Sequence, residues 1–267
     1  RYEQVQQGRF REFYQTNVDI FGSQNPEADA EILAAAADVL TDLGLSAADF
    51  EFRVSHRDIL GGLLESMDSE VETTEAIRAV DKRAKIDIEA YYELLTDAGL
   101  TRTEAESFDE ILRTDDLDDL VAFAGTDRVA EAVENLRAVL DAAAAFGARE
   151  YCAVSLETAR GLDYYTGVVF ECFDTAGEVS RSVFGGGRYD DLIEGYGGEP
   201  TPAVGVGIGH ETLSLLCQRA GVWPEETIGT DYYVLTVGNT RDTAIEIAQQ
   251  LRGLGHVVES DLSGRGF

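Results

Sequence analysis

The chain has 267 residues, of which 44% are hydrophobic, so it can bury a substantial core and is not a disordered polymer. Its apolar stretches are short and interrupted, and we therefore expect no segment that spans a bilayer. Aspartate and glutamate outnumber lysine and arginine by 51 to 21, which gives a net charge of −30. We interpret this excess as a surface adapted to concentrated salt, because dissolved salt screens the mutual repulsion of the carboxylates. The composition thus predicts a halophilic protein.

Cysteine usage indicates a reducing compartment. The three cysteines, Cys152, Cys172 and Cys217, are odd in number and far apart, so they match neither a metal-ligand spacing nor a disulfide framework. We expect reduced thiols and a cytoplasmic location. Because the sequence begins at Arg1 without Met and stops at Phe267, we also expect a fragment of a longer protein.

The beginning of the chain predicts a strand followed by a helix. Residues 9–16 alternate in the pattern of a strand with polar groups on both faces, which is typical of a cleft or a sheet edge. Residues 25–44 predict a helix: Asn25 can cap it, Asp29 favours its positive end, and Gly44 can terminate it.

A helical block is predicted to lie between two β-rich parts. Residues 50–54 read as a short strand, whereas residues 56–147 carry apolar residues at three- and four-residue steps with acidic faces between them. Strands and irregular turns resume after this block and continue to a linker with Pro and Gly at 222–229. Residues 230–267 predict strand, helix and strand, the start of a separate α/β domain.

Two glycine-rich stretches allow more than one structure. Gly-Val-Gly-Ile-Gly-His at 205–210 lacks the spacing and the βαβ context of a dinucleotide site, so we reject that function. Its alternate glycines would leave one face of a strand bare, where a flat ligand or another backbone can approach. The glycines within 184–191 allow the same interpretation, or equally a simple turn.

Four stretches in order resemble the class II histidyl-tRNA synthetase family, and the resemblance covers essentially the whole chain. Residues 1–22 resemble the second class motif, residues 159–171 and 184–198 the two histidine-specific motifs, and residues 202–213 the third class motif. The sequence Arg-Gly-Leu-Asp-Tyr-Tyr-Thr-Gly within 159–171 is the most specific of them.

The resemblance implies an α+β fold, an antiparallel six-stranded sheet flanked by helices, in a homodimer. It implies a catalytic domain in two parts, 1–55 and 149–225, a helical insertion domain at 56–148, and the truncated start of an anticodon-binding α/β domain at 230–267. The implied reaction joins histidine and ATP, with Mg²⁺, into histidyl-adenylate and then passes the histidyl group to the histidine tRNA. No tightly bound organic cofactor and no membrane partner are implied.

The resemblance also assigns roles to single residues. Arg1 and Arg160 would be catalytic, because an ionised carboxylate that attacks a phosphate needs fixed cations and no general base. The residues that would bind histidine are Gln15, Asp19, Arg160, Tyr165 and Tyr189. The residues that would bind ATP are Arg1, Glu3, Arg9, Phe13 and Glu211. Glu211 is also the candidate ligand for Mg²⁺.

Some of these assignments have alternatives. Phe13 could be an ordinary core aromatic, and Arg160 could form a salt bridge with Asp163 or Glu157.

Because a strongly acidic chain gains little from counterion release in high salt, we expect tRNA contacts to use shape, hydrogen bonds and local arginines. The candidate arginines are Arg241, Arg252 and Arg265.

Thr212 departs from the family pattern. The third motif normally ends in Glu-Arg, and a threonine cannot supply that cation, so Arg9 or Arg11 would have to replace it or ATP binding would be weak. The departure slightly favours a non-catalytic paralogue, the histidine-sensing regulatory subunit of ATP phosphoribosyltransferase. The complete histidine-specific motif, Arg1 and the start of an anticodon domain favour the ligase. The histidine-specific motifs also argue against a class II ligase for another amino acid.

Overall fold

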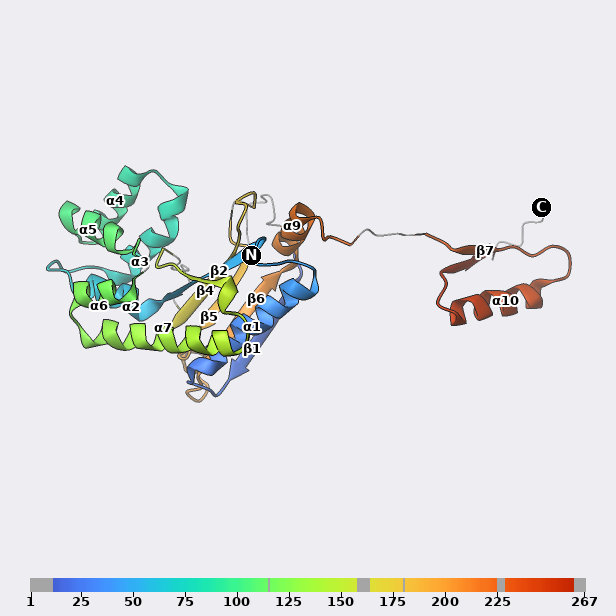
Figure 1. Ribbon diagram of the computed structural model, residues 1–267, viewed down its shortest axis with the longest axis horizontal. Helices are drawn as coiled ribbons and strands as arrows, with labels where there is room; N and C mark the ends of the chain where they lie inside the picture. The colour runs from blue at the N-terminus through green and yellow to red at the C-terminus, as the bar shows by residue number, and fades with distance from the viewer. Residues whose placement is uncertain (1–11, 115, 158–163, 180, 225–228, 262–267) are drawn as a thin grey trace. The chain divides into compact units, whose positions relative to one another are not determined.

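The computed structural model describes residues 12–114, 116–157, 164–179, 181–224 and 229–261 of the chain (Figure 1). Two compact units make up the chain, Arg1–Trp223 and Pro224–Phe267, and each has a sheet of its own.

The larger unit is built on a six-stranded sheet with the strand order β1-β6-β5-β4-β2-β3. Its strands are β1 (Gln15–Phe21), β2 (Phe50–His56), β3 (Cys152–Val154), β4 (Val168–Asp174), β5 (Phe184–Arg188) and β6 (Ala203–Gly209). Only the pairing of β2 with β3 is parallel, and the others are antiparallel. The predicted α+β class and its antiparallel six-stranded sheet are thus confirmed. The strand predicted at 9–16 needs correction: residues 12–14 lie before β1, which begins at Gln15 and forms an edge of the sheet.

Helices cover one face of this sheet and continue beyond it. The α-helices of the larger unit are α1 (Pro26–Asp42), α2 (Arg57–Glu65), α3 (Thr73–Lys82), α4 (Ile88–Asp97), α5 (Arg102–Ile111), α6 (Leu117–Ala124), α7 (Asp127–Ala145), α8 (Leu192–Gly195) and α9 (His210–Ala220). Two short 3₁₀ helices are η1 (Arg83–Lys85) and η2 (Arg149–Tyr151). None of the helices in the described ranges is long and apolar enough to cross a membrane.

The smaller unit has the predicted strand–helix–strand order. The strands β7 (Tyr232–Val234) and β8 (Val258–Ser260) pair in parallel, and α10 (Arg241–Gly253) connects them. Arg252, one of the arginines considered for tRNA contact, donates hydrogen bonds to the carbonyl oxygen of Val258, so its guanidinium helps to hold α10 beside β8.

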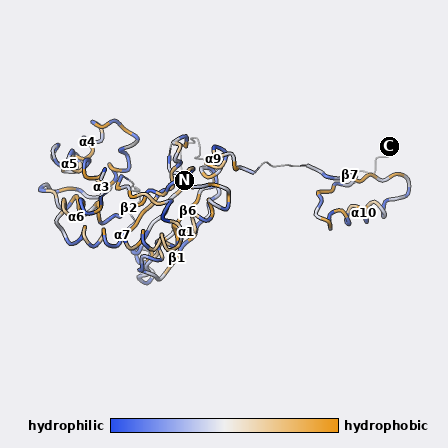
Figure 2. Tube along the Cα trace, viewed as in Figure 1, coloured by the Kyte–Doolittle hydropathy of each residue, from blue (hydrophilic) through white to orange (hydrophobic). Residues whose placement is uncertain are grey.

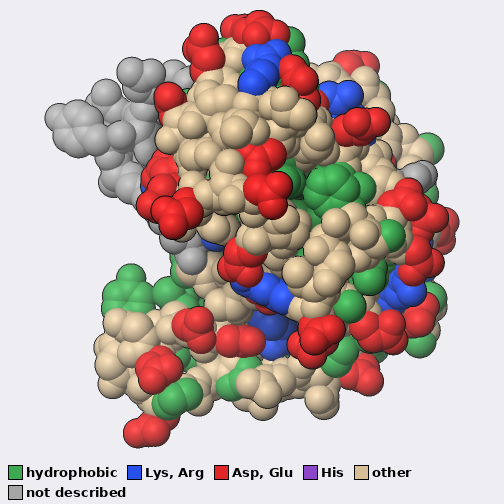
Figure 3. All heavy atoms as spheres, turned by 90° about the vertical axis from the view of Figure 1, so that its left-hand side faces the viewer, with side chains coloured by type: hydrophobic (Ala, Val, Ile, Leu, Met, Phe, Trp, Pro, Cys, Tyr) green, Lys and Arg blue, Asp and Glu red, His purple; other side chains and the backbone are tan. Residues whose placement is uncertain are grey.

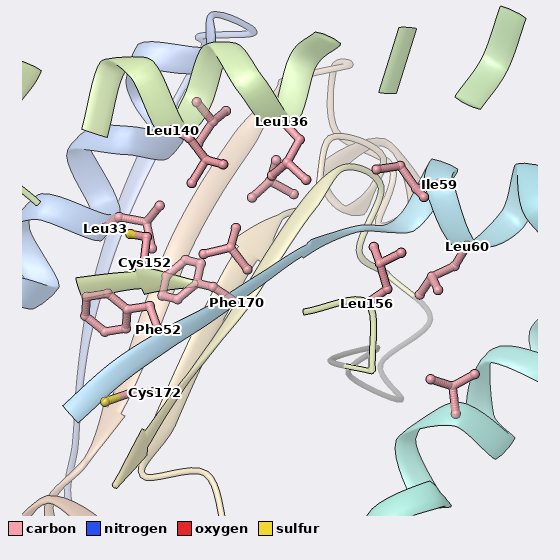
Figure 4. Packing of buried hydrophobic residues seen from close by; sticks show 14 of the residues in the cluster. Leu33, Phe52, Ile59, Leu60, Leu136, Leu140, Cys152, Leu156, Phe170 and Cys172 are labelled. Carbon is pink, nitrogen blue, oxygen red and sulfur yellow. The ribbon is translucent and has the colours of Figure 1, made fainter. Parts of the chain in front are cut away.

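The main core lies between the sheet and the helices α1 and α7. Phe52 of β2 and Phe170 of β4 meet edge to face, with ring centroids 5.9 Å apart. Leu33 of α1 and Leu136 and Leu140 of α7 project towards them (Figure 4). Burying side chains of this size stabilises the fold by about 2–3 kcal/mol each. The amphipathic pattern of α7, visible as alternating colours in Figure 2, therefore places its apolar side on the sheet.

The remaining helices between β2 and β3 pack mainly on one another. Asp109 of α5 is buried among them and accepts hydrogen bonds from Arg83, Arg113 and Tyr92. Arg83 also forms a 2.9 Å ion pair with Glu157, which follows β3, and so connects these helices to the sheet. The predicted domain boundaries on either side of the helical block remain predictions.

Acidic side chains predominate among the charged groups on the surface of the helices between β2 and β3. Figure 3 shows many aspartate and glutamate side chains on this face and few lysine or arginine side chains between them. The three cysteines are all free and buried, as expected for reduced thiols, and burial raises the pKa of Cys152 to about 11.

Two local predictions need correction. The glycines of 184–191 do not form a turn: Gly185, Gly186 and Gly187 lie inside β5, hydrogen-bonded between β4 and β6. Asn25 occupies the N-cap position of α1, but its side chain makes no capping hydrogen bond.

The packing around Gly186 explains why a strand can contain three glycines. A methyl group added there would meet the carbonyl oxygen of Gly205 and lie 2.7 Å from the ring of Phe170. The backbone oxygen cannot rotate away, so the aromatic ring and the neighbouring strand leave room only for hydrogen.

We expect Gly186→Ala to lower the free energy of unfolding by about 2–3 kcal/mol, the usual cost of overpacking a rigid core. Urea unfolding in concentrated KCl measures the change. Gly195→Ala in α8 is the matched control, because a methyl group at that position has no neighbour within 4 Å. Equal stability of the two variants would contradict this explanation of the glycine strand.

Candidate functional site

One face of the sheet is bare along its glycines. Residues that pair across antiparallel strands point to the same face, so Gly205 and Gly207 of β6 share a face with Gly187 of β5. A methyl group at Gly207 would lie 2.5 Å from Nε2 of Gln15, and one at Gly187 would lie 3.0 Å from the ring of Tyr165. The glycines therefore let polar and aromatic side chains lie flat on the sheet, which is the bare-strand alternative that the sequence allowed.

Asp19 and Tyr189 meet on this face. Asp19 projects from β1 over Gly205, whose missing side chain leaves room for the carboxylate. The hydroxyl of Tyr189, directly after β5, donates a hydrogen bond to Oδ1 of Asp19. Burial, together with this bond and the charge of Asp19, raises the pKa of Tyr189 well above its usual value. The phenol therefore stays protonated, and Oδ2 of Asp19 accepts no hydrogen bond from the described residues.

Two more tyrosine rings stand beside this pair. The ring centroids of Tyr164 and Tyr165 are 4.6 Å apart, and Tyr164 meets Tyr189 edge to face at 6.1 Å. Tyr165 is buried, with 7% of its surface exposed, because its ring lies over the backbone of Gly187. The three rings and the carboxylate combine flat aromatic surface with a negatively charged acceptor, an arrangement that suits a small planar group with an N–H donor.

Gln15 lies on the same face as Asp19, because both belong to β1 and are an even number of residues apart. Its amide donates a hydrogen bond to Asn17, which lies between them on that face. Three polar side chains of one edge strand thus line the bare glycine face, and two of them, Gln15 and Asp19, are residues that the resemblance assigned to histidine binding.

Phe13 and Glu211 lie near the start of α9. Phe13 is 50% exposed, so the alternative of an ordinary core aromatic is wrong. The backbone N–H of His210 donates to the carbonyl oxygen of Tyr14 at 2.9 Å, which brings the residues before β1 next to the first turn of α9, where Glu211 lies. An aromatic ring and a carboxylate are therefore available at this end of the face.

Four predicted site residues, Arg1, Glu3, Arg9 and Arg160, lie outside the described residues. The same holds for Arg11, Asp163 and Arg265, which were also considered from the sequence. In the ranges that are described, no group of three or more His, Cys, Asp or Glu side chains could hold a metal ion. The roles assigned to all the site residues remain proposals.

A comparison with protein families decides the relationship of the chain. The family model for histidyl-tRNA synthetase matches residues 1–213, which is most of the sequence. The chain belongs to the histidyl-tRNA synthetase family.

Curated relatives agree with the family. The chain is 80% identical over 267 residues to a histidine–tRNA ligase of Natronomonas pharaonis and 66% identical over 269 residues to one of Haloarcula marismortui. Both alignments cover 100% of this chain and 62% of the relative, so the chain spans about three fifths of their length. These relatives come from halophilic archaea, which fits the interpretation of the acidic surface.

A solved structure agrees in fold. The crystal structure of histidyl-tRNA synthetase from Nostoc sp. PCC 7120 superimposes with a TM-score of 0.82 over 97% of this chain and 63% of that one. Sequence identity is 24%, so this likeness bears on the fold alone.

Thr212, the departure from the synthetase family motif, is buried. Its hydroxyl donates a hydrogen bond to the carbonyl oxygen of Val183, before β5, and lies 3.3 Å from that of Gly209. The side chain therefore anchors α9 to the sheet and supplies no cation to the bare face.

The sequence reasoning missed two residues of the site and one arginine behind it, on the opposite face of the sheet. Tyr164 and Asn17 extend the tyrosine cluster and the polar edge strand, and both could have been found from their positions next to predicted site residues. Arg188 could not have been found, because its main partner lies 159 residues away in sequence.

Proposed function

We propose that the whole protein ligates histidine to its tRNA, with histidyl-adenylate as the intermediate. Membership of the histidyl-tRNA synthetase family and the names of relatives up to 80% identical support this function. The substrates are then histidine, ATP and the histidine tRNA, and we expect a cytoplasmic homodimer.

The observation that carries the proposal is the hydrogen bond between Tyr189 and Asp19 on the glycine face. The tyrosine occupies Oδ1 and leaves Oδ2 as an acceptor, and an imidazole ring presents an N–H donor of matching size. Tyr165 and Tyr164 supply aromatic surface beside that acceptor. A site of this kind rejects apolar amino acids strongly, because they would leave the buried polar groups without partners.

The chemistry of the first step needs cations near the α-phosphate of ATP. The carboxylate of histidine is already ionised, so the protein must bring two anions together and stabilise the charge on the phosphate oxygens. In the proposal Arg1 and Arg160 do this, while Phe13 stacks on adenine and Glu3 and Arg9 contact the nucleotide.

Magnesium would join the site together with ATP. Mg²⁺ is usually held by one or two carboxylates together with substrate phosphates, so the single carboxylate of Glu211 in the first turn of α9 fits such a site. When bound, the ion would neutralise charge on the phosphates.

The regulatory alternative loses support. Thr212 had favoured it, but relatives that cover the whole chain at 65–80% identity are named as ligases.

Histidine-dependent exchange of pyrophosphate into ATP, measured on the whole protein in concentrated KCl, tests the proposal. We expect exchange that requires histidine and that other amino acids do not support. Binding of histidine without exchange would favour a histidine sensor and would overturn the proposed ligase.

A further inference from the structure

Arg188 lies at the end of β5, immediately before Tyr189, and its side chain turns to the opposite face of the sheet. Only 8% of it is exposed. Its Nε and Nη2 donate to the two carboxylate oxygens of Asp29 in α1, at 3.0 and 2.5 Å. Its Nη1 donates to the carbonyl oxygen of Ser23 at 2.9 Å and to Oδ1 of Asp190 at 3.1 Å. Every nitrogen of the guanidinium is therefore engaged.

Arg188 and Asp190 also form hydrogen bonds to the backbone segments that carry the tyrosines. The carbonyl oxygen of Arg188 accepts from the backbone N–H of Thr166, directly after Tyr165, at 2.9 Å. The hydroxyl of Thr166 in turn accepts from the backbone N–H of Asp190 at 3.1 Å. The turn that carries Tyr165 and the residues around Tyr189 are thus joined by a pair of hydrogen bonds.

The residues around Arg188 are also hydrogen-bonded to β6, the strand with the alternate glycines. Oδ1 of Asp190 accepts from the backbone N–H of Ala203 in β6 at 3.1 Å, and the N–H of Tyr189 donates to the carbonyl oxygen of Ala203 at 2.7 Å. Gly167 lets the turn approach closely, because a methyl group there would lie 3.1 Å from Cδ of Arg188. One guanidinium therefore sets the distance between the Tyr165 turn, the Tyr189 backbone and α1.

We propose that Arg188, held by Asp29 and Asp190, is a positioning residue that places Tyr165 and Tyr189 for binding of the histidine side chain. The inference rests on the proposed function, since it assumes that these tyrosines contact the imidazole. Arg188 itself does not reach the ligand: it lies on the core face and acts through the backbone.

The geometry of the guanidinium matters as much as its charge. A lysine at this position keeps one positive charge but has a single nitrogen, which cannot reach both oxygens of Asp29, Ser23 and Asp190 together. The Tyr165 turn would then be free to shift relative to Tyr189, and displacements of about 1 Å in a binding site can cost about 100-fold in rate.

The test is Arg188→Lys in the whole protein, assayed by pyrophosphate exchange in concentrated KCl well below the unfolding temperature. We expect the KM for histidine to rise about 10- to 100-fold, while the KM for ATP changes less than about threefold. Asp190→Asn is a milder second variant in case Arg188→Lys does not fold. It keeps an acceptor oxygen but loses the charge, and we expect a smaller rise in the KM for histidine.

Arg219→Lys is the matched control. Arg219 is also a largely buried arginine whose two terminal nitrogens bind aspartates, Asp49 and Asp174, but it lies on α9. We expect it to lower the unfolding temperature comparably and to leave the KM for histidine unchanged within about twofold, because it makes no contact with the tyrosine turn.

The possible results distinguish a failure of the positioning role of Arg188 from a failure of the proposed function. Equal effects of Arg188→Lys and Arg219→Lys on the KM for histidine, with normal exchange by the unaltered protein, would overturn the positioning role alone. Equal rises in the KM for histidine and for ATP would also overturn it, because a general loss of structure predicts that result. No exchange by the unaltered protein would instead overturn the proposed function.

Discussion

Asp19→Asn is expected to lower kcat/KM for histidine in pyrophosphate exchange by about 100- to 1,000-fold, with little effect on stability. In the unaltered protein the hydroxyl of Tyr189 donates to Oδ1 of Asp19, and Oδ2 remains as the acceptor for an imidazole N–H. In the variant the tyrosine would still donate to the amide oxygen. The amide nitrogen, itself a donor, would then face the N–H of the ligand, so both the charge and the acceptor are lost.

Asp191→Asn provides the control for this experiment. It removes the same charge two residues after Tyr189, but Asp191 is exposed and its side chain makes no capping hydrogen bond to α8. We expect kcat/KM for histidine to stay within about twofold, since an exposed charge is screened in concentrated salt. If Asp19→Asn also stayed within about threefold of the unaltered protein, Asp19 would not bind the imidazole ring and the proposed pocket would be wrong.

The parts of the site that the sequence predicts well are those with a local pattern. The alternation at 9–16 indicated an edge strand, although the strand itself begins at Gln15, and alternate glycines in 205–210 predicted the bare face over which Asp19 lies. Both patterns depend on the period of a strand alone. The period can be recognised in a single segment, without knowing which strand pairs with it.

The parts that the sequence does not predict depend on distant neighbours. Gly185 to Gly187 have the composition of a turn, and only the rings of Phe170 and Tyr165, packed against the two faces of β5, explain why they form a strand. Asp29 was expected to stabilise the start of α1 through the helix dipole, yet it is buried and paired with Arg188. No local signal connects two residues that are 159 positions apart.

The sequence also does not show which ion pairs of this acidic chain contribute most to its stability. Arg102 forms two ion pairs, with Glu89 and Glu106, but all three side chains are largely exposed. Arg219 pairs with Asp174, whose side chain is fully buried, and with Asp49. In molar salt the Debye length falls to about 3 Å, so exposed pairs contribute little and buried pairs keep their strength.

We therefore expect Arg219→Ala to lower the free energy of unfolding by about 3 kcal/mol, because it leaves the buried carboxylate of Asp174 without its cation. The cost should lie at the lower end of the range for broken buried pairs. Asp174 keeps hydrogen bonds from the backbone N–H groups of Ala176, Glu178 and Val179, which still stabilise its charge.

Arg102→Ala tests whether the burial of ion pairs or their number determines how much they stabilise the fold. It removes as many ion pairs as Arg219→Ala, yet we expect a loss of less than about 1 kcal/mol in concentrated KCl. Urea unfolding, followed by the fluorescence of Trp223 and by circular dichroism, measures both variants, and urea leaves the ionic strength unchanged. Trp223 lies just beyond α9, where its backbone N–H donates to the carbonyl oxygen of Cys217, so it reports on the helix that carries Arg219. If Arg102→Ala proved the more damaging variant, exposed carboxylate–arginine pairs would have to stabilise this fold even in molar salt, and burial would not govern the strength of its ion pairs.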